Sequence, residues 1–129
     1  MPNAKDKGSS AERELLHILV GAGFAVVRAA GSGSTSVDAC DLVAGKDGKA
    51  FAIEVKACAG KKQYIQTAQM QELLRFAAAF GATPLVAVKW TRRGWSIIDA
   101  ASIKPTGKLH GVSQDEATPL MNWVSSITL

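Results

Sequence analysis

Two strand-like runs, Asp41-Leu-Val-Ala-Gly45 and Ala50-Phe-Ala-Ile-Glu-Val-Lys56, stand on either side of the polar tetrapeptide Lys46-Asp-Gly-Lys49. Asp-Gly between two such runs is the strongest short-range signal for a β-hairpin with a two-residue turn. If these two central residues form the turn, Asp41 falls directly opposite Glu54. Opposed residues on neighbouring strands have Cβ atoms roughly 4.5–5.5 Å apart. The sequence therefore predicts two carboxylates side by side.

The faces of this hairpin follow from strand alternation, which places Lys56 on the same face as Glu54. The opposite face is expected to be apolar and to carry Phe51, Ile53, Val55, Cys40 and Leu42. One face of the hairpin is thus expected to form core, and the other to present both carboxylates and the lysine.

Paired carboxylates of this kind repel each other unless a positive charge neutralises them. Mg²⁺ suits oxygen ligands and keeps several of its waters. A bound divalent cation lowers the pKa of a coordinated water and stabilises charge on a phosphoryl group. Lys56 would orient that water or neutralise the developing negative charge. The trio predicts phosphodiester hydrolysis, and the alternative is a solvated Glu-x-Lys strand with a surface ion pair.

The remaining segments predict helices and strands around this hairpin. Residues 1–8 are polar and expected to be flexible, and the tail 99–129 is ambiguous apart from a short helix opened by Ser113-x-x-Glu116. Before the hairpin we expect a helix from Ser9 to Gly21, a strand at 24–28 and a Gly/Ser loop at 31–36. After the hairpin we expect a polar loop that contains Lys61 and Lys62, a helix at 66–80, and strands at 84–90 and 95–98. The apolar stripe of the helix at 66–80 is expected to contain Gln69, Leu73, Phe76 and Phe80. The order α-β-β-β-α-β-β predicts one α/β domain, residues 1–129, with a mixed sheet flanked by helices.

The charge distribution favours a polyanionic partner. The net charge is +4, and all 15 Lys and Arg lie at or before Lys108. Such a basic body favours nucleic acid. We expect a cytoplasmic protein, because no secretory signal and no apolar run of about 20 residues is visible. The cysteines Cys40 and Cys58 are expected to be free thiols, and two distant histidines give zinc little to bind.

The spacing of Asp41 and Glu54-Val-Lys56 resembles the PD-(D/E)XK nuclease signature, which implies a restriction-endonuclease-like fold. Across residues 7–98 the chain also resembles, in order, the archaeal-type Holliday junction resolvases. The motifs that carry this resemblance are Gly8-Ser-Ser-Ala-Glu-Arg13, Gly23-Phe-Ala-Val-Val-Arg28, Gly31-Ser-Gly-Ser34, Asp41-Leu-Val-Ala44 and Ile53-Glu-Val-Lys56. Cys40 stands where the signature has proline, a change that leaves the ligands intact.

The resemblance implies a homodimer that cuts four-way DNA junctions symmetrically with Mg²⁺ or Mn²⁺. It implies that Asp41 and Glu54 bind the metal and that Lys56 is catalytic. Glu12 resembles an additional acidic residue near the metal, although Ser9-x-x-Glu12 is also a capping box. Ser32 matches a serine of a mobile loop near the active site, with a plain flexible linker as the alternative. Gln69 matches a helix glutamine that reaches the active site, with a capping or surface role as the alternative.

The predicted DNA contacts are basic residues that the resemblance or the charge pattern singles out: Arg13, Arg28, Lys61, Lys62, Arg92 and Arg93. Lysines and arginines of this kind bind backbone phosphates and confer affinity rather than sequence readout. The alternative for each is a solvated side chain. Phe76 and Phe80 predict core, or the subunit interface of a dimer. Asp38 is a rival to Asp41 but lacks a cross-strand partner.

Three other functions compete with junction cleavage. The first is a restriction-type or repair-type nuclease on the same fold, which would cut linear duplex as well as junctions. The second is a junction-binding protein without catalysis, which would not nick DNA when metal is added. The third is an unrelated basic domain, which predicts salt-sensitive binding without structure preference. The sequence gives no sign of a clamp or helicase partner.

Overall fold

The computed structural model describes residues 4–29 and 37–128 of the chain. The elements within these ranges are α1 Ala4–Gly21, β1 Ala25–Arg28, β2 Leu42–Lys46, β3 Lys49–Cys58, β4 Lys62–Gln66, α2 Thr67–Phe80, β5 Thr83–Trp90, β6 Gly94–Asp99, β7 Pro105–Thr106, β8 Leu109–Ser113, β9 Thr118–Pro119 and α3 Leu120–Thr128. Two short 3₁₀ helices, η2 Ala100–Ser102 and η3 Gln114–Glu116, lie among the last strands.

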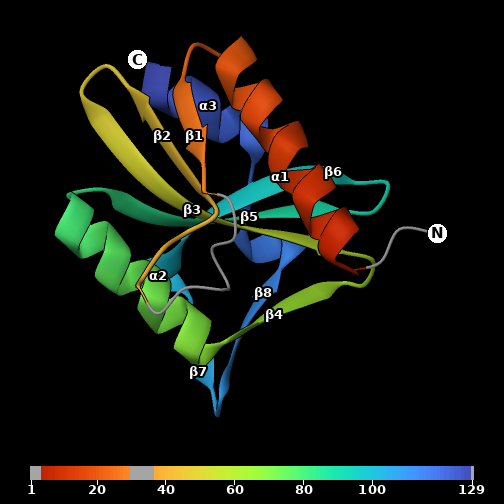
Figure 1. Cartoon of the computed structure of the whole chain (residues 1–129). Helices are drawn as coiled ribbons and strands as arrows, with labels where there is room; N and C mark the ends of the chain where they lie inside the picture. The colour runs from red at the N-terminus through yellow and green to blue at the C-terminus, as the bar shows by residue number, and fades with distance from the viewer. Residues whose placement is uncertain (1–3, 30–36, 129) are drawn as a thin grey trace.

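The strands form two sheets. The main sheet has the order β1-β2-β3-β5-β6-β9, in which β3 and β5 run parallel and all other neighbours run antiparallel. A smaller antiparallel sheet, β4-β8-β7, projects from the body beside the start of α2 (Figure 1). The predicted mixed sheet flanked by helices is confirmed.

The hairpin of β2 and β3 forms in the predicted register. Asp47 and Gly48 have φ of 52° and 79°, the positive values that a type I′ turn requires at both central residues. The pairing runs from Lys46 opposite Lys49 to Leu42 opposite Ile53. Asp41 comes one residue before this ladder, and its N–H donates to the Ile53 carbonyl.

Helices cover both faces of the main sheet (Figure 1). Helices α1 and α3 pack on one face, in a core that includes Leu15, Leu19, Leu42, Ile53 and Val124. Helix α2 packs on the other face, in a core that includes Ala52, Met70, Leu73, Val86 and Val88. Glu54 and Lys56 therefore follow Ala52 along the same face of β3, and Ala52 is buried under α2.

One prediction about the hairpin faces is wrong. Cys40 does not share the face of Leu42 but packs in the α2 core beside Ala52. The reason is that β2 begins at Leu42, so strand alternation does not extend to Cys40. The face that presents Glu54 and Lys56 also contributes to the core, because Ala52 packs in the α2 cluster.

Other element predictions also need correction. Helix α1 begins at Ala4 rather than at Ser9. The expected polar loop contains strand β4, which starts at Lys62. The buried stripe of α2 is Met70, Leu73 and Ala77, one position away from the expected Gln69 and Phe76. The tail is ordered, and it supplies β9 at the edge of the main sheet, helix α3 and the predicted short helix after Ser113.

Within the described ranges, none of the helices combines the length and the hydropathy needed to cross a membrane.

Candidate active site

Asp41 is fixed between β1 and β3 by backbone hydrogen bonds. Its N–H donates to the Ile53 carbonyl at 3.1 Å, and its carbonyl accepts from the Ala29 N–H at 2.9 Å. Its carboxylate oxygen Oδ2 accepts from the Val55 N–H at 2.8 Å. With only 8% of its surface exposed, Asp41 is held rigidly at the opening of the hairpin.

Glu54 lies on β3 close to Asp41, with 15% of its side chain exposed. Burial and, next, the negative charge of Asp41 raise the pKa of the Glu54 carboxyl to about 7. Such a shift is expected where two carboxylates share one partly buried site, and here Lys56 offsets only part of it. The predicted closeness of the two acids is confirmed, since Asp41 acts on Glu54 both through its charge and through a side-chain hydrogen bond.

Lys56 joins this pair from two positions further along β3. Its ammonium Nζ lies 3.5 Å from Glu54 Oε2 and donates to Gln69 Oε1 at 3.3 Å. Gln69 comes from the first turn of α2, so the side chain predicted to reach the site does so. The strand and the helix thus hold the lysine between a carboxylate and an amide.

Glu12 approaches the same place from α1. Burial and the charge of Asp41 raise the pKa of Glu12, while Arg28 acts in the opposite direction. The Arg28 Nε donates to Glu12 Oε1 at 2.9 Å, and the Arg28 Nη2 donates to Ser9 Oγ at 3.1 Å. The capping-box alternative is wrong, because Ser9 lies inside α1 and the Glu12 carboxylate accepts from Arg28 instead.

The donor set fits a hard divalent cation. Within residues 4–29 and 37–128, no group of three His, Cys, Asp or Glu side chains is placed to hold one ion. Mg²⁺ nevertheless commonly binds through one or two carboxylates and completes its shell with water and substrate phosphates. Asp41 and Glu54 supply that pair, and the raised pKa of Glu54 reflects the cost of placing its charge beside Asp41 in a partly buried site. Glu12, engaged by Arg28, stays a predicted ligand.

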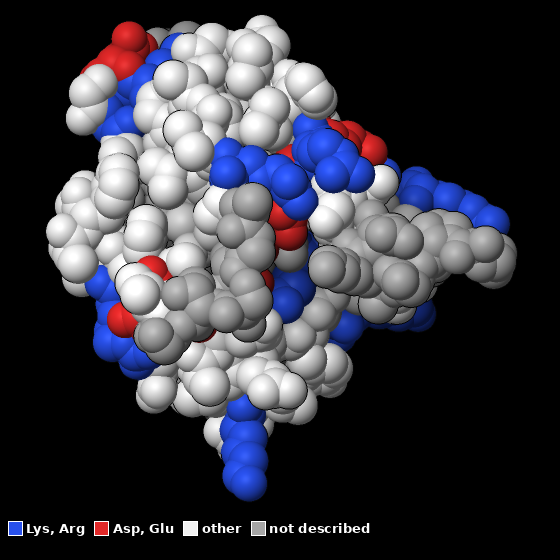
Figure 2. Space-filling model, viewed as in Figure 1, with Lys and Arg blue, Asp and Glu red and all other residues white. Residues whose placement is uncertain are grey.

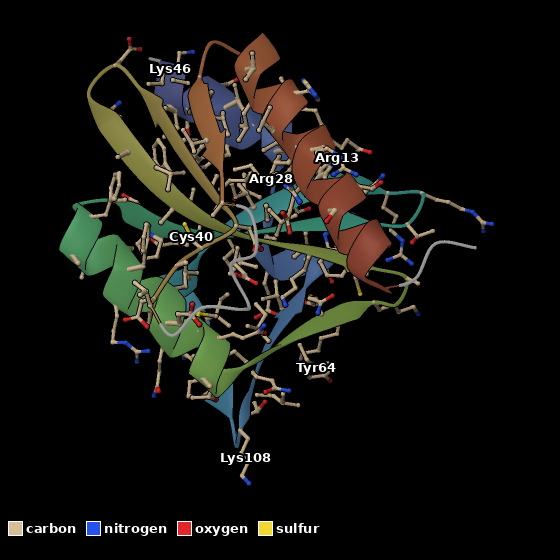
Figure 3. All side chains as sticks on the ribbon, viewed as in Figure 1. Arg13, Arg28, Cys40, Lys46, Tyr64 and Lys108 are labelled. Carbon is tan, nitrogen blue, oxygen red and sulfur yellow. The ribbon has the colours of Figure 1, made fainter. Side chains whose placement is uncertain are left out.

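The predicted DNA contacts lie on α1, at the end of β1 and at two turns between strands. Figure 2 shows acidic atoms near the middle of one face, with basic atoms directly above and below them. Arg13 is exposed on α1, and Arg28 points toward the centre (Figure 3). Lys61 and Lys62 are exposed at the β3–β4 turn. Arg92 and Arg93 form the β5–β6 turn, where Arg93 donates to Gln114 at 3.2 Å. Ser32 lies outside the described residues.

Two residues of α2 that the sequence did not single out hold the chain just before Asp41. Glu72 Oε2 accepts from the Ala39 N–H at 3.0 Å. Arg75 donates twice to Asp38, each bond being 2.9 Å long. Asp38, the rival acid, is thereby engaged with α2 rather than with the site. No local sequence pattern predicts these contacts, because the partners lie more than thirty residues apart in the sequence.

The raised pKa of Glu54 predicts a pH-dependent stability of the metal-free protein. Its ordinary value is 4.5 and its value in the fold is about 7, so the folded state holds the proton more tightly. The stability that this proton provides is complete below about pH 4.5 and is lost as the pH rises to about 7, a change of about 3 kcal/mol. Denaturant titrations with EDTA between pH 4.5 and 8 measure it against Glu54→Gln, which cannot titrate. If the free energy of unfolding changed with pH in the same way in both proteins, the raised pKa could not belong to Glu54.

The sequence of this chain is similar to those of proteins from one known family. A sequence model of the family described as archaeal Holliday junction resolvase (Hjc) matches residues 3–128. The crossover junction endodeoxyribonuclease Hjc of Archaeoglobus fulgidus is 38% identical over 104 residues, which are 81% of this chain and 76% of that protein. The enzyme of the same name from Methanocaldococcus jannaschii is 40% identical over 84 residues, 65% of this chain and 59% of that protein.

A solved structure agrees with the sequence matches. The structure of Archaeoglobus fulgidus Hjc, described as a Holliday junction resolvase from an archaeal hyperthermophile, superposes with a TM-score of 0.84 at 31% sequence identity. The superposition covers 91% of this chain and 99% of that one. The tail beyond residue 98 is therefore included in the likeness, which the motifs alone did not reach.

Proposed function

This chain belongs to the archaeal Holliday junction resolvase family, and from that premise we propose that it resolves four-way DNA junctions by hydrolysing phosphodiester bonds at Asp41, Glu54 and Lys56. The observation that carries this proposal is the pair of partly buried carboxylates with a lysine 3.5 Å away. A site of this kind binds a divalent cation and a phosphate together.

We assign the cation, Mg²⁺ or Mn²⁺, to Asp41 and Glu54. When bound, it would lower the pKa of a water and stabilise negative charge on the scissile phosphate. The rigid hydrogen bonds of Asp41 keep one carboxylate in place before DNA arrives. Fixed ligands of this kind avoid reorganisation during the reaction.

Lys56 supplies the chain's own positive charge beside the reacting phosphate. An ammonium group donates only, so Lys56 either orients the attacking water or donates to a phosphoryl oxygen as negative charge builds up. The water oxygen bonds to phosphorus while the bond to the leaving sugar oxygen breaks. Gln69, which accepts from Lys56, holds the ammonium toward the site.

The experiment that tests this function compares a synthetic four-way junction with linear duplex of the same sequence. We expect paired nicks in two opposite strands of the junction when Mg²⁺ is present, and no cleavage in EDTA. Equal cutting of the duplex would favour a restriction-type or repair-type nuclease. Binding without metal-dependent nicks would favour a non-catalytic junction-binding protein.

We further propose that the active form is a homodimer. Two identical strands must be cut at symmetric positions, and a twofold axis relates two sites in the required way. The side chains of Phe76 and Phe80 stack at 5.6 Å near the end of α2, and 55% of Phe80 is exposed. Exposed aromatic side chains are enriched at protein interfaces. Sedimentation of the protein alone should give twice the mass of one chain, and Phe80→Asp should lower the measured mass toward that of one chain.

A cytoplasmic location stays a prediction.

A further inference from the structure

The small sheet of β4, β8 and β7 has one buried face and one open face. Ile65, His110 and Val112 point inward and are buried. The opposite face, here called the Tyr64 face, is formed by the alternate residues Lys62, Tyr64, Gln66, Leu109, Gly111 and Ser113. It is the outer surface of a sheet that projects from the body (Figure 1).

Two apolar side chains on this face are open to solvent. Tyr64 is 49% exposed and Leu109 is 38% exposed. Figure 3 shows Tyr64 lying outside β4, on the side away from α2. An aromatic ring in such a place offers a flat surface to a ligand.

Gly111, opposite Tyr64, keeps this surface flat. A Cβ added there would lie 2.5 Å from Lys62 Cε and 3.3 Å from Tyr64 Cε1. A side chain at this position would displace the end of Lys62 from its place across the strand. Its ammonium then stands 5.7 Å from the centre of the Tyr64 ring, so a cation and an aromatic ring are held side by side.

The segments that build the Tyr64 face are purely basic. Residues 60–66 and 103–113 contain four lysines, Lys61, Lys62, Lys104 and Lys108, and no Asp or Glu. The nearest acids follow in η3, where Glu116 caps its own helix through Ser113. Lys108 extends outward from the tip of the sheet (Figure 3). The charge of this face complements a polyanion.

The strand that carries Tyr64 is also linked along the chain to both elements of the active site. Strand β4 joins β3, which carries Glu54 and Lys56, to α2, which carries Gln69. The start of α2 is tied to the tip of the sheet, because the Thr67 N–H donates to the Lys108 carbonyl at 2.9 Å. The small sheet is thus tied to the start of the helix that carries Gln69.

We propose that the Tyr64 face contacts DNA at the branch point of the junction, with Tyr64 stacking on an exposed base and Lys62 and Lys108 binding phosphates. This inference rests on the proposed function. In a continuous duplex each base is covered by its neighbours, whereas stacking is interrupted where arms meet. Aromatic side chains bind such open base faces without regard to sequence. The face would therefore favour branched over linear DNA.

The only tyrosine of the chain provides a direct probe. Protein labelled with 3-fluorotyrosine has a single ¹⁹F resonance, at Tyr64. In EDTA, so that no DNA is cut, we expect a four-way junction to shift or broaden this resonance more strongly than linear duplex does. An unchanged resonance in the presence of bound junction would overturn the proposal.

Two variants at the same position separate the ring from its hydroxyl. Tyr64→Ala should raise the dissociation constant for the junction about tenfold, and for duplex much less. Tyr64→Phe should bind like the wild type, as should Met121→Ala, which removes another exposed apolar side chain, on α3. Thermal unfolding confirms that each variant is folded.

The outcomes distinguish this inference from the proposed function. If the wild type fails to cut junctions, the proposed function is wrong. If the wild type binds and cuts junctions while Tyr64→Ala binds them equally well, only the role of the Tyr64 face is wrong.

Discussion

Replacing Glu54 by alanine is expected to lower the rate of junction cleavage by about 10³-fold or more while the junction remains bound. The change removes one of the two carboxylates assigned to the cation, whose stabilisation of the phosphoryl charge amounts to several kcal/mol. Each 1.36 kcal/mol changes the rate about tenfold. Binding persists because lysines and arginines on phosphates supply it. Single-turnover cleavage with saturating Mg²⁺ and a gel shift in EDTA measure the two quantities.

A matched control exists in the same hairpin. Asp47→Asn also removes a carboxylate but lies at the turn, where asparagine is equally suited to the positive φ of 52°. It should cleave at the wild-type rate. If Glu54→Ala lost binding and stability along with cleavage, its effect would be structural, and Glu54→Gln, which keeps the volume, would then decide between the two readings.

The hairpin was predictable because its determinants are local. A two-residue Asp-Gly turn fixes the register of β2 and β3, which brings Asp41 to the part of β3 that carries Glu54, where hydrogen bonds to Ile53 and Val55 hold it. Strand alternation then adds Lys56. The face prediction failed one residue before the strand, at Cys40, where the backbone no longer alternates. The chemistry of the site was thus encoded within sixteen residues.

What the sequence did not reveal depends on contacts between distant segments. The pairing of Glu12 with Arg28 joins α1 to β1, and a capping box was an equally good local explanation. Strand β4 has no apolar alternation of its own, since only Ile65 is buried among polar neighbours. It forms because β8, from the ambiguous tail, pairs with it over five residues. Local pattern cannot supply a partner strand that lies more than forty residues away.

The segment before Asp41 illustrates the same limit. Proline in the family signature would stiffen this approach, and Cys40 cannot do so. In this chain Glu72 holds the Ala39 N–H and Arg75 holds Asp38, so hydrogen bonds from α2 fix the backbone instead. The sequence showed that the proline is missing, but it did not show the hydrogen bonds from α2 that hold this segment.

Replacing Lys56 by methionine, which keeps the length of the side chain and removes its charge, is expected to slow cleavage about 10²- to 10³-fold. That range is typical for the loss of one donor aimed at developing negative charge. Because Lys56 is not a metal ligand, the Mg²⁺ concentration that gives half of the maximal rate should change little, whereas Glu54→Ala should raise it strongly. Metal titrations of single-turnover rates separate the two roles.

The pH of this experiment matters, because Lys56 also lowers the pKa of Glu54. Without the lysine, that pKa moves further up, and protons compete more strongly with the cation near neutral pH. Rates are therefore compared at pH 8.5, where Glu54 is more fully ionised in either protein, and Lys49→Met on the same strand serves as the control. A defect that vanishes at pH 8.5 would show that Lys56 acts only through Glu54. A defect of two orders of magnitude or more that persists there assigns Lys56 to the reacting phosphate or water.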